Sequence, residues 1–150
     1  MRVVIQRVDY AKVVVSGCEV ATIDTGLLVF CGFEEADTSD DLEWIAGKIR
    51  RMRIFNDSEG VMNISVEEAG GQILLVSQFT LHASTKKGNR PSYIRAMHPE
   101  AAGIFFERFV QQMTAQTEVP VRAGVFGAHM EIELLNNGPV TIIVDSKSRE

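Results

Sequence analysis

The segment with the clearest chemical potential is Ser77-Gln78-Phe79-Thr80, which brings two hydroxyls and an amide together directly after an apolar run at 73–76. The ends of strands in α/β proteins are places where backbone N–H groups face ligands. Free N–H groups near Phe79 and Thr80 would hold an oxyanion during ester cleavage, and losing one such donor typically costs about 3 kcal/mol. The alternative interpretation is a plain strand end, whose hydroxyls satisfy the local backbone.

Asn137-Gly138-Pro139 is the second segment of interest. Asn-Gly between two strand-like runs is a common hairpin signal, and Pro139 would stiffen such a turn. The Gly138–Pro139 bond is also a candidate cis peptide, although only about 5–6% of X–Pro bonds in folded proteins are cis. The residues alone leave both interpretations open.

Familiar catalytic patterns are missing from the sequence. The histidines at 82, 98 and 129 belong to no nucleophile signature, and neither GxSxG, HExxH nor a phosphate-binding glycine loop occurs. Cys18 and Cys31 form no CxxC motif, so we expect no metal site and no cofactor, and we expect both cysteines to be reduced core residues. Any catalysis is therefore expected to depend on backbone groups, hydroxyls or the substrate.

The net charge of −5 argues against indiscriminate binding of polyanions. More than half of the 15 basic residues nevertheless lie in two acid-free clusters. Such a cluster can dock a nucleic acid through one face, whereas the first cluster is equally well explained by a favourable interaction with a helix dipole. The clusters are Lys48, Arg50, Arg51 and Arg53, and Lys86, Lys87, Arg90 and Arg95.

The apolar patterns predict one mixed α/β domain over residues 1–150. Most of residues 1–33 and 119–144 is typical of β-structure, and the apolar runs at 27–31 and 73–76 indicate strands that are buried on both faces. Helices are expected after a cap at 38–40 and from Pro99 onward. No apolar stretch approaches the roughly 18 residues of a membrane span, and the first residues do not resemble a secretory signal, so we expect a cytoplasmic location without membrane association.

Several segments, in the same order along nearly the whole chain, resemble the D-aminoacyl-tRNA deacylases, historically called D-tyrosyl-tRNA deacylases. The resemblance implies a single-domain three-layer β/β/α fold, with mixed sheets and two main helices. It also implies a homodimer whose active sites lie at the subunit interface. The segments are 1–8, 26–30, 77–81, 86–91, 124–128 and 137–141.

The implied activity is hydrolysis of the ester bond of D-aminoacyl-tRNA, and of glycyl-tRNA mischarged on tRNA-Ala, which releases free amino acid and tRNA as chiral proofreading. The catalytic segment would be Ser77, Gln78, Phe79 and Thr80. A cis Gly138–Pro139 peptide of the partner subunit would face the substrate amino group and exclude L side chains. Rejection by a rigid backbone wall can exceed that of a roomy apolar pocket. The supporting residues would be Arg7, Asn137 and Thr141.

The resemblance implies that one basic segment lies near the tRNA acceptor end and contacts phosphates rather than bases. The residues of this segment are Lys86, Lys87, Asn89 and Arg90. Such contacts suit a protein that serves many tRNAs. The sequence departs from common family residues at Ser84, His129 and Asn137, which puts the contacts that flank the site in doubt.

Three questions stay open at this stage. The first concerns the mechanism: either Thr80 is the nucleophile, or the 2′-hydroxyl of the terminal ribose assists an attacking water. The second mechanism is favoured, because Thr80 has no activating base nearby in the sequence. A non-catalytic aminoacyl-tRNA-binding module with the same fold is the rival from another class. A relative with a trans Gly-Pro bond, acting on L-alanyl-tRNA, is the rival enzyme.

Overall fold

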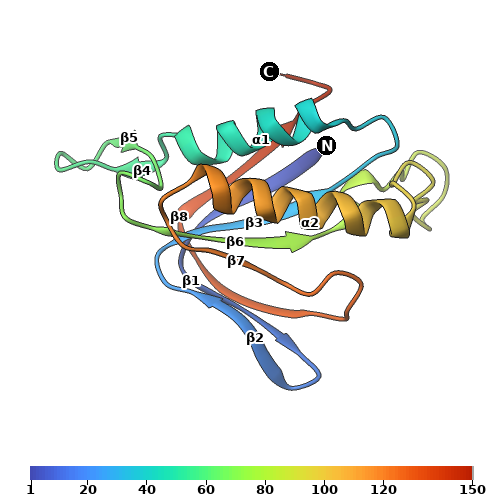
Figure 1. The fold of residues 1–150 in the computed structure, drawn as a ribbon, viewed down its shortest axis with the longest axis horizontal. Coiled ribbons are helices and arrows are strands. Elements are labelled where there is room, and N and C mark those ends of the chain that lie inside the picture. The colour runs from blue at the N-terminus through green and yellow to red at the C-terminus, as the bar shows by residue number, and fades with distance from the viewer. Residues whose placement is uncertain (150) are drawn as a thin grey trace.

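The computed structural model describes residues 1–149 and contains one mixed β-sheet covered by two helices (Figure 1). Strand β1 pairs antiparallel with three strands. Strand β8 lies along one of its edges, and along the other edge its first half pairs with β3 and its second half with β2. Next to β3 come β6 and β7, each parallel to its neighbour. The strands are β1 (Arg2–Val15), β2 (Cys18–Ile23), β3 (Gly26–Gly32), β6 (Gln72–Ser77), β7 (Val121–Ala123) and β8 (Glu131–Asp145).

Two register shifts in the β1–β8 ladder, between Gln6 and Tyr10, divide the sheet into two β layers. One layer holds the first half of β1 with β3, β6 and β7, and the other holds the second half of β1 with β2. Alternate residues of β3 belong to different cores: Val29 faces the helices, whereas Leu28 packs with Val13 between the two β layers. The three-layer β/β/α prediction is confirmed, and so is the prediction that β3 and β6 are buried on both faces.

Helices α1 (Ser39–Arg51) and α2 (Pro99–Gln116) lie over the first β layer (Figure 1). The chain enters α1 through a capping box, in which the Thr38 N–H donates to the Asp41 carboxylate at 2.8 Å. Pro99 occupies the first turn of α2, where its missing N–H costs nothing. The apolar stripes predicted from the spacing are buried against the sheet, and they include Leu42, Ile45 and Ile49 from α1 and Ala102, Phe106, Phe109 and Met113 from α2.

Two small elements complete the fold. Strands β4 (Phe55–Asn56) and β5 (Met62–Ile64) form a separate two-stranded sheet after α1. A 3-10 helix, η1 (Phe79–His82), follows β6 after one intervening residue. None of the helices within residues 1–149 is long and apolar enough to cross a membrane.

One expectation is wrong, and one of two open interpretations is excluded. Cys18 is exposed, because it begins β2 directly after the tight Ser16-Gly17 turn; only Cys31 is a core residue. The Asn137-Gly138-Pro139 segment makes no hairpin, because the runs on both sides of it belong to one strand, β8, and pair with β1 over almost its whole length. Long-range pairing with β1 therefore overrides the local turn signal.

Candidate active site

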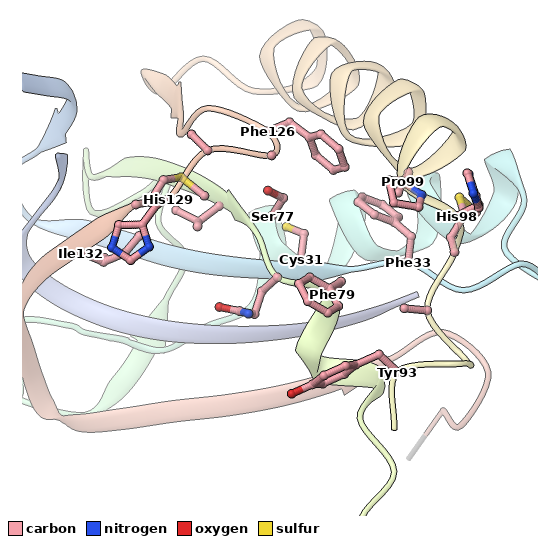
Figure 2. A pocket seen from close by; sticks show the side chains of 18 of the residues that line it. Cys31, Phe33, Ser77, Phe79, Tyr93, His98, Pro99, Phe126, His129 and Ile132 are labelled. Carbon is pink, nitrogen blue, oxygen red and sulfur yellow. The ribbon is translucent and has the colours of Figure 1, made fainter. Parts of the chain in front are cut away.

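A cavity of about 620 Å³ opens between the carboxyl end of β6, the start of α2 and the segment that leads into β8. Figure 2 shows Ser77 and Phe79 on one side of it, with Phe33 and Phe126 on the helix side. Gln78 completes the contribution of the β6 end. Three of the four predicted catalytic residues therefore line one cavity, whose walls are mostly apolar.

The backbone at this edge of the cavity holds two free donors. The Gln78 N–H donates to the Cys31 carbonyl at 2.7 Å and ends the β3–β6 pairing. Phe79 and Thr80 occupy the first two positions of η1, where a helix supplies no carbonyl to its own N–H groups. Neither N–H donates to any acceptor within residues 1–149. Together they form a pair of adjacent donors of the kind that binds an oxyanion.

Thr80 is not among the residues that line this cavity. It lines a second one, of about 760 Å³, together with Leu81, Trp44 and Ile143. The Thr80 hydroxyl accepts a hydrogen bond from the Gln78 side-chain amide. An amide nitrogen cannot take up the hydroxyl proton, so this contact does not activate Thr80 as a nucleophile.

The remaining titratable groups of the cavity offer no strong nucleophile. Cys31 lies in its wall, but burial raises the pKa of this thiol far above the neutral range, so it stays protonated. His98 and His129 are exposed residues of the rim, on opposite sides of the opening (Figure 2). The described part of the chain holds no cluster of three metal-ligating side chains.

Part of the cavity wall was not assigned from the sequence. Phe126 packs against Phe106 with ring centroids 6.1 Å apart, and its ring approaches α2 at Gly103, where an added Cβ would lie 3.3 Å from it. Gly127, with φ +77°, turns the chain toward His129. The segment 124–128 belongs to the family resemblance, which was the available signal, but only the folded structure brings it opposite Ser77.

The predicted tRNA-binding residues lie together on one exposed loop. Ser84 and Ser92 pair with each other in an isolated bridge that closes the loop, with N···O distances of 2.8 and 2.9 Å. Lys86, Lys87, Asn89 and Arg90 are all exposed between them.

The first basic cluster is engaged differently: Arg50 forms a salt bridge with Glu67 at 2.9 Å, and Arg53 donates to the Asn63 carbonyl at 2.6 Å. These contacts give Arg50 and Arg53, two of the four residues of this cluster, a structural role.

The Gly138–Pro139 peptide is cis, as the resemblance implied, and its flanks are held on both sides. The Arg7 guanidinium, which is buried, donates to the Asn137 carbonyl at 3.3 Å. The Asn136 amide donates to the carbonyls of Arg7 and Val140, at 3.0 and 3.1 Å, and so bridges the peptide. Asn136 was missed by the sequence analysis, because an asparagine beside Asn-Gly gives no signal of its own.

Two further predicted residues make only peripheral contacts here. The Asn137 amide donates to Asp9 at 2.7 Å, and the Thr141 hydroxyl accepts from the Gln6 amide at 3.2 Å.

The Ser77–Thr80 segment and the Gly138–Pro139 peptide lie far apart within one chain. Across the sheet, Ser77 pairs with Cys31, Cys31 with Val3, and Val3 with Val144. Ser77 and Val144 therefore lie at the same position along the strand direction. Gly138 lies six residues before Val144, about 20 Å along the strand, and three strand spacings across the sheet, about 14 Å. One chain therefore does not bring Gly138 to its own cavity.

The three-layer fold and this cavity, with two free N–H donors at its edge, define a small α/β protein with a candidate active site. A family model described as D-Tyr-tRNA(Tyr) deacylase matches residues 4–145, and the chain belongs to this family of D-aminoacyl-tRNA deacylases. Two similar proteins, both named D-aminoacyl-tRNA deacylase, come from Flavobacterium johnsoniae and Dechloromonas aromatica. They are 55% and 57% identical to this chain over 150 residues, and each match covers the whole of both chains.

Solved structures agree on the fold. A structure described as c-Myc DNA Unwinding Element Binding Protein superposes with a TM-score of 0.92 at 37% identity, over 97% of this chain and 98% of the other. A second, described as a probable eukaryotic D-amino acid tRNA deacylase, gives a TM-score of 0.76 over 95% of this chain and 97% of the other. At 21% identity this second likeness concerns the fold alone.

Proposed function

We propose that this deacylase cleaves the ester of D-aminoacyl-tRNA, and of glycyl-tRNA mischarged on tRNA-Ala, in the cavity beside Ser77. The observation that carries the proposal is the pair of unpartnered N–H groups at Phe79 and Thr80, which follow directly on Ser77 and Gln78 at the edge of this cavity, with Phe79 in its lining. Tetrahedral intermediates of ester hydrolysis carry a negative oxygen, which two such donors stabilise. The mostly apolar cavity accepts the terminal nucleoside and excludes bulk water.

The attacking water is assisted by the 2′-hydroxyl of the terminal ribose rather than by a side chain. Thr80 has only the Gln78 amide on its hydroxyl, and Cys31 is held as a thiol. No nucleophile–base pair remains among the side chains that line the cavity, so the substrate itself supplies the assisting hydroxyl. Gln78 positions the segment through its contact with Thr80.

The active unit is a homodimer in which each subunit lends Gly138–Pro139 to the cavity of the other. Two observations support this. Gly138 is too far from Ser77 within one chain, and β8, although rich in apolar residues, has none of its 15 residues buried. Ile143 is 68% exposed and lines the Thr80 cavity. Since β8 also carries Gly138, a two-fold contact through this strand brings each Gly138 toward the partner's Thr80.

The Gly138–Pro139 backbone then provides the chiral filter. A D and an L residue differ only in which position at Cα carries the side chain, so a rigid main-chain wall beside the amino group rejects the L isomer. Glycine has no side chain to clash and is accepted. Arg7 and Asn136 hold this wall through their contacts with its flanks.

The exposed loop with Lys86, Lys87, Asn89 and Arg90 binds phosphates of the tRNA acceptor end, independently of base sequence. We place this activity in the cytoplasm, where tRNA is charged and used.

A mixed-subunit experiment tests the shared site. Phe79→Pro removes one of the two free donors, and its fixed φ suits the first position of η1. Gly138→Ala introduces a Cβ that would lie 2.9 Å from the Arg7 Nη2 and from the Val140 Cγ2, at a φ of +121°. Phe79→Pro alone is expected to lose at least about a hundredfold in deacylation, equivalent to one lost donor. Gly138→Ala alone is also expected to be inactive, because the strained and displaced peptide no longer fits beside the substrate.

When the two inactive variants are unfolded and refolded together, activity is expected to return to about a quarter of the native rate. Half of the randomly formed dimers are mixed, and each mixed dimer contains one complete site. No recovery would mean that both motifs serve the same subunit, and the shared site would be wrong.

Matched D-aminoacyl, L-aminoacyl and glycyl tRNAs address the remaining alternatives in the same assay. Turnover of the D-aminoacyl and glycyl substrates alone is the expected result. Absence of turnover for all three would favour a non-catalytic aminoacyl-tRNA-binding module, and turnover of L-alanyl-tRNA would favour an L-specific relative.

A further inference from the structure

An exposed aromatic notch lies at the rim of the cavity, on the side of the basic loop. The rings of Phe79 and Tyr93 meet edge to face, with centroids 5.0 Å apart and planes at 75°. Phe79 is 56% exposed and Tyr93 is 40% exposed, and Ile94 beside them is 90% exposed. In Figure 2 both aromatic side chains stand at the opening, opposite Phe126. Apolar side chains left in solvent at the edge of a site usually mark a binding surface.

The shape of this notch suits a flat ring. Two planes at 75° leave the face of one ring beside the edge of the other, so a planar ligand can stack on one and contact the second. Aromatic side chains of this kind hold unpaired nucleobases, and they tolerate any base because every base has a π-face.

The charge around the notch selects a nucleic acid over an apolar protein partner. No Asp or Glu occurs between Glu68 and Glu100 in the sequence, and the nearby Glu34 forms a salt bridge with Arg95 at 3.7 Å. The exposed loop keeps the three cations Lys86, Lys87 and Arg90. A base on the notch would therefore have its phosphates next to this loop. Stacking aromatics beside a basic track are the usual combination in proteins that bind single-stranded nucleic acid.

We propose that the Phe79–Tyr93 notch stacks the unpaired base of the nucleotide that precedes the terminal adenosine of the substrate. This inference rests on the proposed function, which places the terminal adenosine inside the cavity. Phe79 and Tyr93 line that cavity, and Tyr93 directly follows the basic loop closed by Ser84 and Ser92, so a strand that runs from the cavity to the loop passes over the notch. The contact adds affinity for a single-stranded 3′ end without adding sequence preference.

Three non-hydrolysable probes separate this contact from binding in the cavity. The first is adenosine carrying D-tyrosine in a 3′-amide linkage. The second is the same compound extended on its 5′ side by one cytidine nucleotide, and the third has an abasic ribose in place of that cytidine. The native protein is expected to bind the cytidine probe about tenfold more tightly than the abasic probe, which corresponds to stacking of one base.

The ratio of the dissociation constant of the abasic probe to that of the cytidine probe is then measured in variants. Tyr93→Ala is expected to reduce the ratio to about one, whereas Tyr93→Phe keeps it because the ring remains. Tyr10→Ala is the matched control, since Tyr10 is 38% exposed but pairs with Glu133 on the β1–β8 ladder. It is expected to leave the ratio unchanged.

A ratio near one in the native protein, or a tenfold ratio that survives in Tyr93→Ala, overturns the proposal. Sedimentation of the same variants identifies the competing role: if Tyr93→Ala shifts the oligomeric state and keeps the ratio, the notch is a protein contact. If the adenosine probe itself does not bind the native protein, the placement of adenosine in the cavity is wrong, and the notch proposal fails with it.

Discussion

Arg7 and Asn137 meet across the β1–β8 ladder, where the Arg7 Nε donates to the Asn137 carbonyl at 3.3 Å. The same guanidinium donates through Nη1 to the Ile54 carbonyl at 2.7 Å and to the Asn56 side chain at 3.3 Å. One buried cation thus joins the flank of Gly138–Pro139 to the segment that follows α1. The position of the peptide in space therefore depends on a residue 130 positions before Asn137.

Replacing Arg7 tests this connection. Arg7→Ala is expected to lower the free energy of unfolding by about 2–3 kcal/mol, because the buried carbonyl of Ile54 loses its charged donor. It should also reduce the preference for D- over L-aminoacyl substrates, since the flank of Gly138 is no longer held. Guanidinium chloride unfolding and paired deacylation assays measure the two effects.

Lys12→Ala is the control for this prediction, because Lys12 lies on the same strand, is only half-buried and pairs with the exposed Glu133. A small change in its unfolding midpoint is expected. An Arg7→Ala protein as stable and as selective as Lys12→Ala would show that Arg7 does not brace the peptide.

The elements with strong local signals could be predicted from the sequence. The runs at 27–31 and 73–76 are apolar at every position, which requires burial on both faces, and both are central strands. Helices α1 and α2 combine a capping residue or a proline with an apolar stripe. In these segments the local preference and the tertiary environment agree.

The candidate site was only partly predictable, because its parts meet through long-range packing. Ser77 and Phe79, predicted at the end of a strand, line one cavity, whereas Thr80, in the same predicted segment, lines a different one. Asn136 and Phe126 carry no chemical pattern in the sequence. The continuity of β8 through Pro139 depends on pairing with β1, which no local rule contains.

The role of Thr80 is tested by comparing a side-chain change with a substrate change. Thr80→Ala is expected to reduce deacylation by no more than about tenfold, through loss of the Gln78 contact. A substrate that ends in 2′-deoxyadenosine is expected to lose at least about a hundredfold, because the assisting hydroxyl is gone. Single-turnover rates with both changes decide the question, and an inactive Thr80→Ala that still binds the D-tyrosyl amide of adenosine would restore Thr80 as the nucleophile.

The basic loop is tested through the salt dependence of tRNA binding. Lys86→Ala and Lys87→Ala are each expected to weaken binding and to flatten the slope of log Kd against log salt by roughly 0.7–0.9, the effect of one lost phosphate contact. Lys48→Ala is the matched control, because Lys48 belongs to the first basic cluster and lies over the Trp44 ring at 5.3 Å. Equal slopes for all three variants and the native protein would remove the loop from the tRNA interface.

A last prediction concerns the acid stability of the α1 cap. Burial raises the pKa of the Asp41 carboxyl, but hydrogen bonds from Lys147 and Thr38 outweigh it, and the pKa in the folded protein lies well below its ordinary value near 3.8. The Lys147 Nζ lies 2.7 Å from the carboxylate. Since folding depresses this pKa, the ionised carboxylate stabilises the fold fully above about pH 5 and loses that contribution as the pH falls through and below 4.

Asp41→Asn keeps a cap acceptor for Thr38 and removes the charge. It is expected to cost about 1 kcal/mol at pH 7, a modest value because Lys147 is 38% exposed, and the difference from the native protein should shrink as the pH falls below 4. Asp40→Asn, a change to an exposed carboxylate in the same turn, is the control. Urea unfolding between pH 3 and 7 gives the comparison, and a difference that stays constant over this range would show that the Asp41 charge does not contribute.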